Sequence, residues 1–407
     1  MPILQTAYSA AEYSQLRSLV KEFDAYNGEE NEALYRPMRD MLKRYLENVL
    51  RLDLTHHLQA GRYQRNPQRT DYRNGAYRRN LVTSFGAIPM LTVPRPRKGG
   101  LPTKVFRRYQ RRWKKVDNYI RKLFLTGVST RETGLVLEDL LDTKPSAGTV
   151  SNINKTLHNE VRQFQRRALT DQYRFLILDG IWVKVSGHKV VKKAILVAYG
   201  IRQDGIREVV GFRLARAESG PECESFLMDL RQRGLLGENL ELVTIDGSPG
   251  LKSAAELVYA HVPVQRCWVH KLRNVSRYLK ASQRAACLAE AREIYRAPGY
   301  REAVARFRSW ASRWRPIAPR AVACLEHDLE DLLTFLRLIK DCVLRVKVRT
   351  TNAIERTFRE LRKRIRPMCC FANPESCERI VCALFVTFNR KWKEKPLWKP
   401  TQFTQKS

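Results

Sequence analysis

Two aspartates in this sequence follow strongly apolar stretches and could together bind divalent cations. Asp179 lies in the apolar run 175–183, and Asp246 directly follows the run 242–245. Because side chains alternate along a strand, Asp179 shares a face with isoleucines, where a carboxylate is costly unless it is paired or binds metal. Asp246 is expected at the carboxyl end of a strand, where α/β folds place ligands. If the two strands are neighbours, a divalent cation would relieve the repulsion between the carboxylates.

A third carboxylate, Glu355, lies on a stretch predicted to form one helix over residues 350–367. An apolar stripe at spacings of four, three and four residues consists of Ile354, Phe358, Leu361 and Ile365. The adjacent stripe, turned by ~100°, holds Glu355, Arg359, Arg362 and Arg366. A metal-bound carboxylate beside arginines suits phosphodiester chemistry, although exposed Glu–Arg pairs are the alternative interpretation. Glu360 is a rival third acid, but it lies ~140° round the helix from Glu355, so both cannot face one metal.

The pair Cys267 and His270 lies between these acids in the sequence and has two interpretations. A Cys-x-x-His could be half of a zinc site, completed by cysteines 369, 370 or 377, but no second pair at zinc-finger spacing follows. The favoured interpretation is that Cys267 and His270 pack or form hydrogen bonds near the active site, with His270 able to contact DNA or a water.

The elements that would hold these residues predict an α/β fold of the ribonuclease-H-like type. Strands are expected at 175–185, 193–201, 208–214, 240–245 and 262–267, with a helix at 221–233 and another after residue 250. Three antiparallel strands followed by helix, strand, helix and strand match the order of that fold. We expect the core in two parts, 171–274 and 346–395, which are separated by an all-α insertion at 275–345.

The N-terminal part is expected to be mainly helical and to bind DNA. Residues 1–60 are predicted to be helical, and 61–115 to form a loosely packed basic arm. Turn signals at Asn74-Gly75 and Phe85-Gly86 punctuate this arm, with a short hairpin pairing 81–83 with 90–93. Basic residues interleaved with aromatics end the arm, among them Arg108, Arg111, Arg112, Lys114 and Lys115.

Residues 116–170 are predicted to form short helices in a helix-turn-helix outline, and 396–407 a C-terminal tail. Ser129 or Thr130 could cap the second helix, and 149–157 could be the recognition helix. Any three-helix bundle would give a similar pattern, so the outline alone does not assign DNA binding.

Composition favours a nucleic-acid partner. The 407 residues include 75 Lys+Arg against 41 Asp+Glu, a formal net charge of +34, and their hydrophobic fraction of 43% is sufficient for a folded core. Such a surplus repels itself unless a polyanion neutralises it, although a ribosomal or merely soluble basic protein would share it. Nine cysteines at irregular spacing, with neither a signal peptide nor a long apolar run, predict a soluble, intracellular protein.

The motifs and their order resemble the Mutator-type transposases of bacterial insertion sequences. The resemblance is carried by Asp179, Asp246, Cys267-x-x-His270 and the stretch Thr351-Asn352-x-x-Glu355-Arg356. It extends over about residues 61–390 through Tyr72-Arg73-Asn74-Gly75, Val93-Pro94-Arg95, Gly127-Val128-Ser129-Thr130-Arg131, Gln265-Arg266-Cys267 and Arg366-Pro367-Met368. One departure is Cys369, which stands where that family usually has glycine, and this leaves the geometry of the turn open.

The resemblance implies a catalytic core with two aspartates and one glutamate, Mg²⁺ or Mn²⁺ as cofactor, and terminal inverted repeats in double-stranded DNA as substrate. Our hypothesis is that Asp179 bridges two ions, with Asp246 on one and Glu355 on the other. Asn352 and Arg356 are expected to support the site or contact DNA. A homodimer is expected because two DNA ends must be brought together. The alternatives are a transposase-derived DNA-binding regulator without catalysis, and a structure-selective nuclease such as a junction resolvase.

Overall fold

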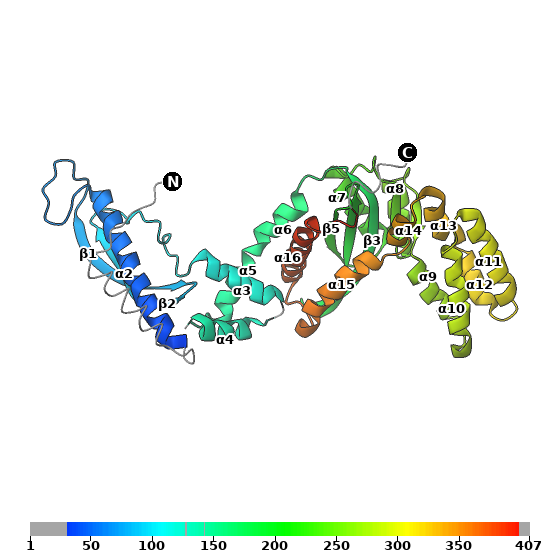
Figure 1. Cartoon of the computed structure of the whole chain (residues 1–407), viewed down its shortest axis with the longest axis horizontal. Coiled ribbons are helices and arrows are strands. Elements are labelled where there is room, and N and C mark those ends of the chain that lie inside the picture. The colour runs from blue at the N-terminus through cyan, green and yellow to red at the C-terminus, as the bar shows by residue number, and fades with distance from the viewer. Residues whose placement is uncertain (1–30, 127, 142, 399–407) are drawn as a thin grey trace. The chain divides into compact units, whose positions relative to one another are not determined.

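The structure is a computed structural model that describes residues 31–126, 128–141 and 143–398. The chain divides into two compact units, residues 1–154 and 155–407 (Figure 1). The predicted helical region at 1–60 is helical over its described part, and residues 1–30 lie outside the described residues. None of the helices in the described ranges is long and apolar enough to cross a membrane.

A helix and a two-stranded hairpin form the first part of the N-terminal unit. These elements are α2 (Asn31–Leu58), β1 (Arg73–Thr83) and β2 (Gly86–Pro96), and the hairpin turns between Thr83 and Gly86. The strands are longer than predicted, because Asn74-Gly75 does not end a strand. It lies instead at an irregularity inside β1, where Gly75 has a φ of 65°. Long strands present a full apolar row, so the hairpin packs against α2 and is not a loosely packed arm. Their shared core contains Leu46, Leu50, Leu81, Leu91 and Val93.

Three short helices complete this unit: α3 (Lys114–Thr126), α4 (Thr130–Leu141) and α5 (Ala147–Lys155). They enclose a second small core that includes Val116, Ile120, Leu137 and Val150. Ser129 caps α4 as predicted, since its hydroxyl accepts from the amide of Glu132 while the Glu132 carboxylate accepts from the Ser129 amide. The predicted recognition helix is α5, which begins two residues earlier than expected and ends at Lys155.

A five-stranded mixed sheet lies at the centre of the second unit. The strand order is β5-β4-β3-β6-β7. The antiparallel strands are β3 (Tyr173–Val185), β4 (Val191–Arg202) and β5 (Arg207–Ala215), and the strands parallel to β3 are β6 (Leu242–Ile245) and β7 (Val264–Arg266). All five predicted strands are therefore confirmed, with ends that shift by a few residues.

The two faces of the sheet are covered by different helices. Leu176, Leu178 and Leu196 belong to one core cluster with residues of α7 (Gly220–Gln232) and α8 (Pro249–Val258). On the other face, α15 (Asn352–Ile365) packs near β3, and α16 (Pro374–Lys393) packs against β5. The buried amide of Asn389 on α16 accepts from the N–H of Val209 and donates to its carbonyl, which fixes that helix to the edge strand.

The segment 275–345, which was predicted to be an all-α insertion, is mostly helical. After α6 (Leu157–Arg166) and the strands, the chain runs through α9 (Trp268–Ser276), α10 (Ala281–Tyr295), α11 (Tyr300–Trp314), α12 (Pro319–Glu326), α13 (Leu329–Leu338) and α14 (Cys342–Val348). Buried aromatic residues such as Phe307, Trp310 and Trp314 give α11 its packing face. The chain then returns through α15 to the sheet.

A tight turn after α15 returns the chain to the end of β3. The short 3₁₀ helix Arg366–Met368 ends at Cys369, whose backbone has φ 55° and ψ −43°. Two residues later, Phe371 donates to the carbonyl of Lys184 at 2.9 Å and accepts from the N–H of Ser186 at 2.7 Å. The turn therefore needs a positive φ at Cys369. Glycine adopts this conformation more easily than a residue with a side chain.

We predict that Cys369→Gly stabilises the protein by about 0.5–1 kcal/mol, because the gain from relieving the positive φ exceeds the greater entropy of an unfolded glycine. Urea unfolding of the full chain measures this difference. Cys342→Gly is the matched control, since Cys342 is also exposed but has helical geometry, and this change should not raise stability. A loss of stability in Cys369→Gly would contradict the prediction.

Candidate active site

Asp179 and Asp246 lie next to each other at the same end of two hydrogen-bonded strands. The parallel register pairs Leu178 of β3 with Ile245 of β6, so each aspartate is the next residue along its strand or just beyond it. Asp179 is 5% exposed, and its Oδ1 accepts from the N–H of Gly180 at 2.8 Å. Asp246 is half-buried, and its Oδ1 accepts from the N–H of Ser248 at 2.9 Å, just before α8 begins.

The pKa of Asp179 shows that the two carboxylates lie close together. Burial, reinforced by the negative charge of Asp246, raises the pKa of Asp179 to about 7, and Glu355 contributes in the same direction. Asp179 is difficult to ionise because it is buried beside a second carboxylate. A divalent cation that bound both carboxylates would favour the charged form of each. The two aspartates therefore have the chemistry expected of part of the metal site that the sequence predicts.

Glu355 projects from α15 toward the same region and is held by cations. Its Oε1 accepts from His270 Nε2 at 3.2 Å and from Arg273 Nη1 at 3.4 Å. The hydrogen bond from His270 is the main reason why the pKa of Glu355 is lowered. Across the described residues, no three His, Cys, Asp or Glu side chains are already close enough together to hold a metal ion. Glu355 thus lies near enough to Asp179 to raise its pKa, but it is paired with His270 rather than gathered with the two aspartates.

Cys267 and His270 connect the end of β7 with the start of α15. The Cys267 thiol accepts from both the amide and the hydroxyl of Thr351, at 3.3 and 3.4 Å. Hydrogen bonds to Cys267 and to Glu355 raise the pKa of His270 to about 10, so the imidazole is a cation at neutral pH. This is the arrangement favoured from sequence, in which the pair forms hydrogen bonds beside the acids.

Glu218 is an acid near the site that the sequence analysis missed. It precedes α7, and it approaches the sheet over Gly180, where an added Cβ would stand 2.3 Å from Glu218 Oε1. Burial and the charge of Asp246 raise its pKa, and the Trp182 side chain forms a hydrogen bond with its carboxylate. The only sequence signal was the absence of a side chain at Gly180, because the approach of Glu218 depends on how the loop folds back.

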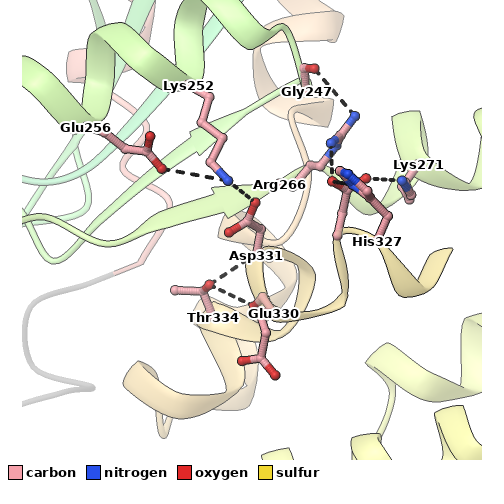
Figure 2. Close-up of polar contacts among 10 residues, drawn as sticks. Gly247, Lys252, Glu256, Arg266, Lys271, His327, Glu330, Asp331 and Thr334 are labelled. Atoms are coloured by element: carbon pink, nitrogen blue, oxygen red, sulfur yellow. Dashed lines mark hydrogen bonds and ion pairs between the residues drawn. The ribbon is translucent and has the colours of Figure 1, made fainter. Parts of the chain in front are cut away.

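The loop that carries Asp246 is fixed to the helical insertion by buried charges (Figure 2). Arg266, the last residue of β7, packs against Gly247, pairs with Asp328 at 2.6 Å and lies 3.5 Å from the Gly247 carbonyl. Asp328, which is 6% exposed, also pairs with Lys271 of α9. Gly247 has a φ of 105°, and a Cβ there would stand 2.6 Å from Arg266 Nε, so glycine is required for this approach.

The predicted arginine row is exposed along α15. Asn352, Arg356, Arg359, Arg362 and Arg366 are all exposed. Within the described ranges, no ion pair involves any of these four arginines, which leaves their guanidinium groups available to an anion. The rival acid Glu360 is also exposed and pairs with Lys363 at 2.8 Å, away from His270.

The predicted cations of the N-terminal unit differ among themselves. Arg108, Arg111, Lys114 and Lys115 are exposed, whereas Arg112 is half-buried and pairs with Asp117 at 2.9 Å. Arg112 also lies beside Val82 in an isolated bridge to the hairpin. Its side chain is therefore engaged in holding the unit together, while the other four face solvent.

Comparisons with known proteins agree on one family. The family model described as "Transposase, Mutator family" matches residues 15–395. The chain is 35% identical over 88% of its length to the transposase for insertion sequence element ISRM5 of Rhizobium meliloti, of which 89% is covered. It is 31% identical over 78% of its length to the transposase for IS905 of Lactococcus lactis (80% covered). The corresponding values for the transposase for IS256 in transposon Tn4001 of Staphylococcus aureus are 30% and 87%, with 90% covered.

The raised pKa of Asp179 predicts a stability change with pH. The folded protein holds this proton more tightly than an unfolded aspartate with a pKa of 3.8, so stability falls as pH rises from there to about 7. Asp179→Asn avoids this loss and should be more stable than the wild type above pH ~7, by about 1–4 kcal/mol, with a smaller margin near pH ~4. Thermal unfolding without divalent ions tests it, and a margin that does not change with pH would contradict it.

Proposed function

The chain belongs to the Mutator family of transposases, and on that premise we propose that it cleaves the ends of an insertion sequence and joins them to target DNA at a site formed by Asp179, Asp246 and Glu355. The observation that carries the proposal is the pairing of a buried and a half-buried aspartate at one sheet end, with Glu355 of α15 near enough to Asp179 to raise its pKa. The strand order of the sheet supports a ribonuclease-H-like core.

Asp179, Asp246 and Glu355 would hold two Mg²⁺ or Mn²⁺ ions. Bound there, such ions supply Lewis-acid activation of the attacking and leaving oxygens of a phosphodiester. The carboxylates of Asp179 and Asp246 must both be ionised to bind, and the raised pKa of Asp179 makes this depend on the cation itself.

His270 and the arginines of α15 have separate parts in the proposal. His270 orients the Glu355 carboxylate through the 3.2 Å hydrogen bond to Oε1. Arg359, Arg362 and Arg366 follow Glu355 along one stripe of α15, where they can hold phosphates that flank the reacting one. No protein nucleophile is required, because water and then a DNA 3′-hydroxyl attack.

The N-terminal unit is proposed to bind the terminal repeats. One of its clefts is lined by four arginines with two tyrosines among them, namely Arg79, Arg95, Arg108, Arg111, Tyr77 and Tyr109. Arg95 lies over the Tyr77 ring at 4.5 Å, and Tyr109 is 80% exposed. An arginine-rich cleft with exposed aromatics suits a phosphate backbone, and α5 of the same unit could read bases. Two copies of the chain would bring the two ends together.

The rival functions differ from this proposal in what they require. A DNA-binding regulator would not need the three acids, whereas this chain retains all of them, with two at the same sheet end. A structure-selective nuclease would cut without joining. Strand transfer, scored separately from nicking, distinguishes the proposed transposase from both.

We predict that Asp179→Asn and Glu355→Gln each reduce cleavage by on the order of 10³-fold or more, because each removes a charged metal ligand. The assay uses the ends of the insertion sequence that encodes this chain, with Mg²⁺ or Mn²⁺. Binding of the ends in a gel-shift experiment should persist in both variants. Glu256→Gln, whose side chain is 54% exposed on α8, is the control and should cleave normally. Normal cleavage by Asp179→Asn would refute the assignment.

We also predict that end binding weakens steeply with salt, since phosphate contacts release counterions. With about six such contacts, affinity should fall roughly 10³-fold between ~50 and ~200 mM salt. Replacing Arg108 and Arg111 together by glutamine should lower the logarithmic slope by about two. The control Arg308→Gln changes an exposed arginine of α11 and should leave the slope unchanged. A flat response in the wild type would exclude a phosphate-dominated contact.

A further inference from the structure

A cavity of the C-terminal unit lies along α15, and the proposed chemistry does not use it. Its volume is about 330 Å³, within the range of small-ligand pockets. The lining comes from β4, β5, α14, α15, α16 and the segment after α16. Aromatic residues in the lining are Tyr199, Phe388 and Trp392, and the charged ones are Arg207, Lys347, Arg356 and Glu360. We call this cavity the aromatic pocket.

The aromatic wall is assembled by packing between the sheet and α16. Phe388 and Trp392 lie one turn apart on α16, and their rings stack with centroids 5.8 Å apart. Tyr199 of β4, which is fully buried, meets Trp392 edge-on at 5.5 Å. Phe388 and Trp392 are only half-buried, so part of this wall is open to a ligand. A half-open aromatic wall can stack with a planar, π-rich ligand.

The other wall is polar and carries a net positive charge. Three of its four charged residues are cations, and Asn352, Thr350 and Thr357 add hydrogen-bonding groups. Arg207 lies over the Trp392 ring at 5.3 Å, and both Arg207 and Arg356 act electrostatically on the Tyr199 hydroxyl. Among the ion pairs of the described residues, none includes Arg207, Lys347 or Arg356. A ligand that combines an aromatic ring with negative charge complements both walls.

The pocket shares a helix and a sheet face with the proposed active site. Asn352, Arg356 and Glu360 line it at four-residue spacing along α15, and Glu355 precedes Arg356 on the same helix. On the sheet, Tyr199 pairs with Ile177, which lies two residues before Asp179 and therefore on the same face. A DNA strand that crosses the acids thus lies within reach of the pocket.

We propose that the aromatic pocket binds one unstacked nucleotide of the DNA whose backbone lies at the active site. The base stacks on the open part of the Phe388–Trp392 wall, and Arg356 and Lys347 bind its phosphate. Paired bases in a duplex keep their faces covered by their neighbours, so a single nucleotide must leave the stack to enter. This proposal deepens the proposed function and rests on it.

The test measures the affinity of the full chain for two duplexes of equal length, one fully paired and one with a single unpaired 5-iodouridine. Stacking on an aromatic side chain should favour the second duplex by about 5- to 150-fold. Irradiation should crosslink the iodouridine to the peptide that contains Phe388 and Trp392. Trp392→Leu keeps apolar bulk but removes the ring, so it should lose most of the preference and bind the paired duplex as before.

Two further variants make the result decisive. Trp392→Phe restores an aromatic face and should recover most of the preference. Tyr278→Leu removes an aromatic that is 52% exposed and does not line the pocket, so it should change neither affinity. Crosslinks on other peptides, or a preference that survives in Trp392→Leu, would overturn the pocket assignment. If the wild type failed to bind even the paired duplex, the proposed function itself would fail, which is a different result.

Discussion

The hydrogen bonds between Cys267, Thr351, His270 and Glu355 determine where the third acid of the proposed site lies. Asp179 and Asp246 are positioned by the sheet, but Glu355 lies on a helix that returns to the sheet only after the whole helical insertion. Thr351, buried at the start of α15, binds the Cys267 thiol at the end of β7, and His270 reaches Glu355 from one turn further along α9. These hydrogen bonds keep Glu355 in a fixed position relative to the end of β7, although the helical insertion separates the two segments in the sequence.

The same connection sets the charge balance of the site. Asp179 resists ionisation because it is buried beside Asp246, whereas Glu355 ionises readily because His270 and Arg273 face it. The protonated imidazole therefore gives the Glu355 carboxylate a positively charged partner. If a metal ion binds Glu355 as proposed, it would share this carboxylate with His270, so the strength of the His270–Glu355 hydrogen bond would influence the affinity for metal.

Sequence reasoning predicted those parts of the molecule that depend on local pattern. The five strands, the helix of Glu355 and the Ser129 cap follow from periodicity and capping chemistry, which act over a few residues. The long hairpin was missed because Asn74-Gly75 is a turn signal that the fold uses as a bulge. Glu218 and the aromatic pocket were missed because their neighbours come from distant segments. Cys369 lies between these cases: the resemblance marked its position as a glycine, and its φ of 55° gives the physical reason.

The Arg266–Asp328–Lys271 network connects the helical insertion to the loop that carries Asp246. Asp328 neutralises two cations, one of which packs against the glycine beside Asp246. Deletion of α10–α13 would remove Asp328 and leave Arg266 and Lys271 without this counter-ion. The helical insertion therefore helps to hold the loop that carries Asp246. A variant in which the insertion is shortened or replaced needs another carboxylate at the position of Asp328.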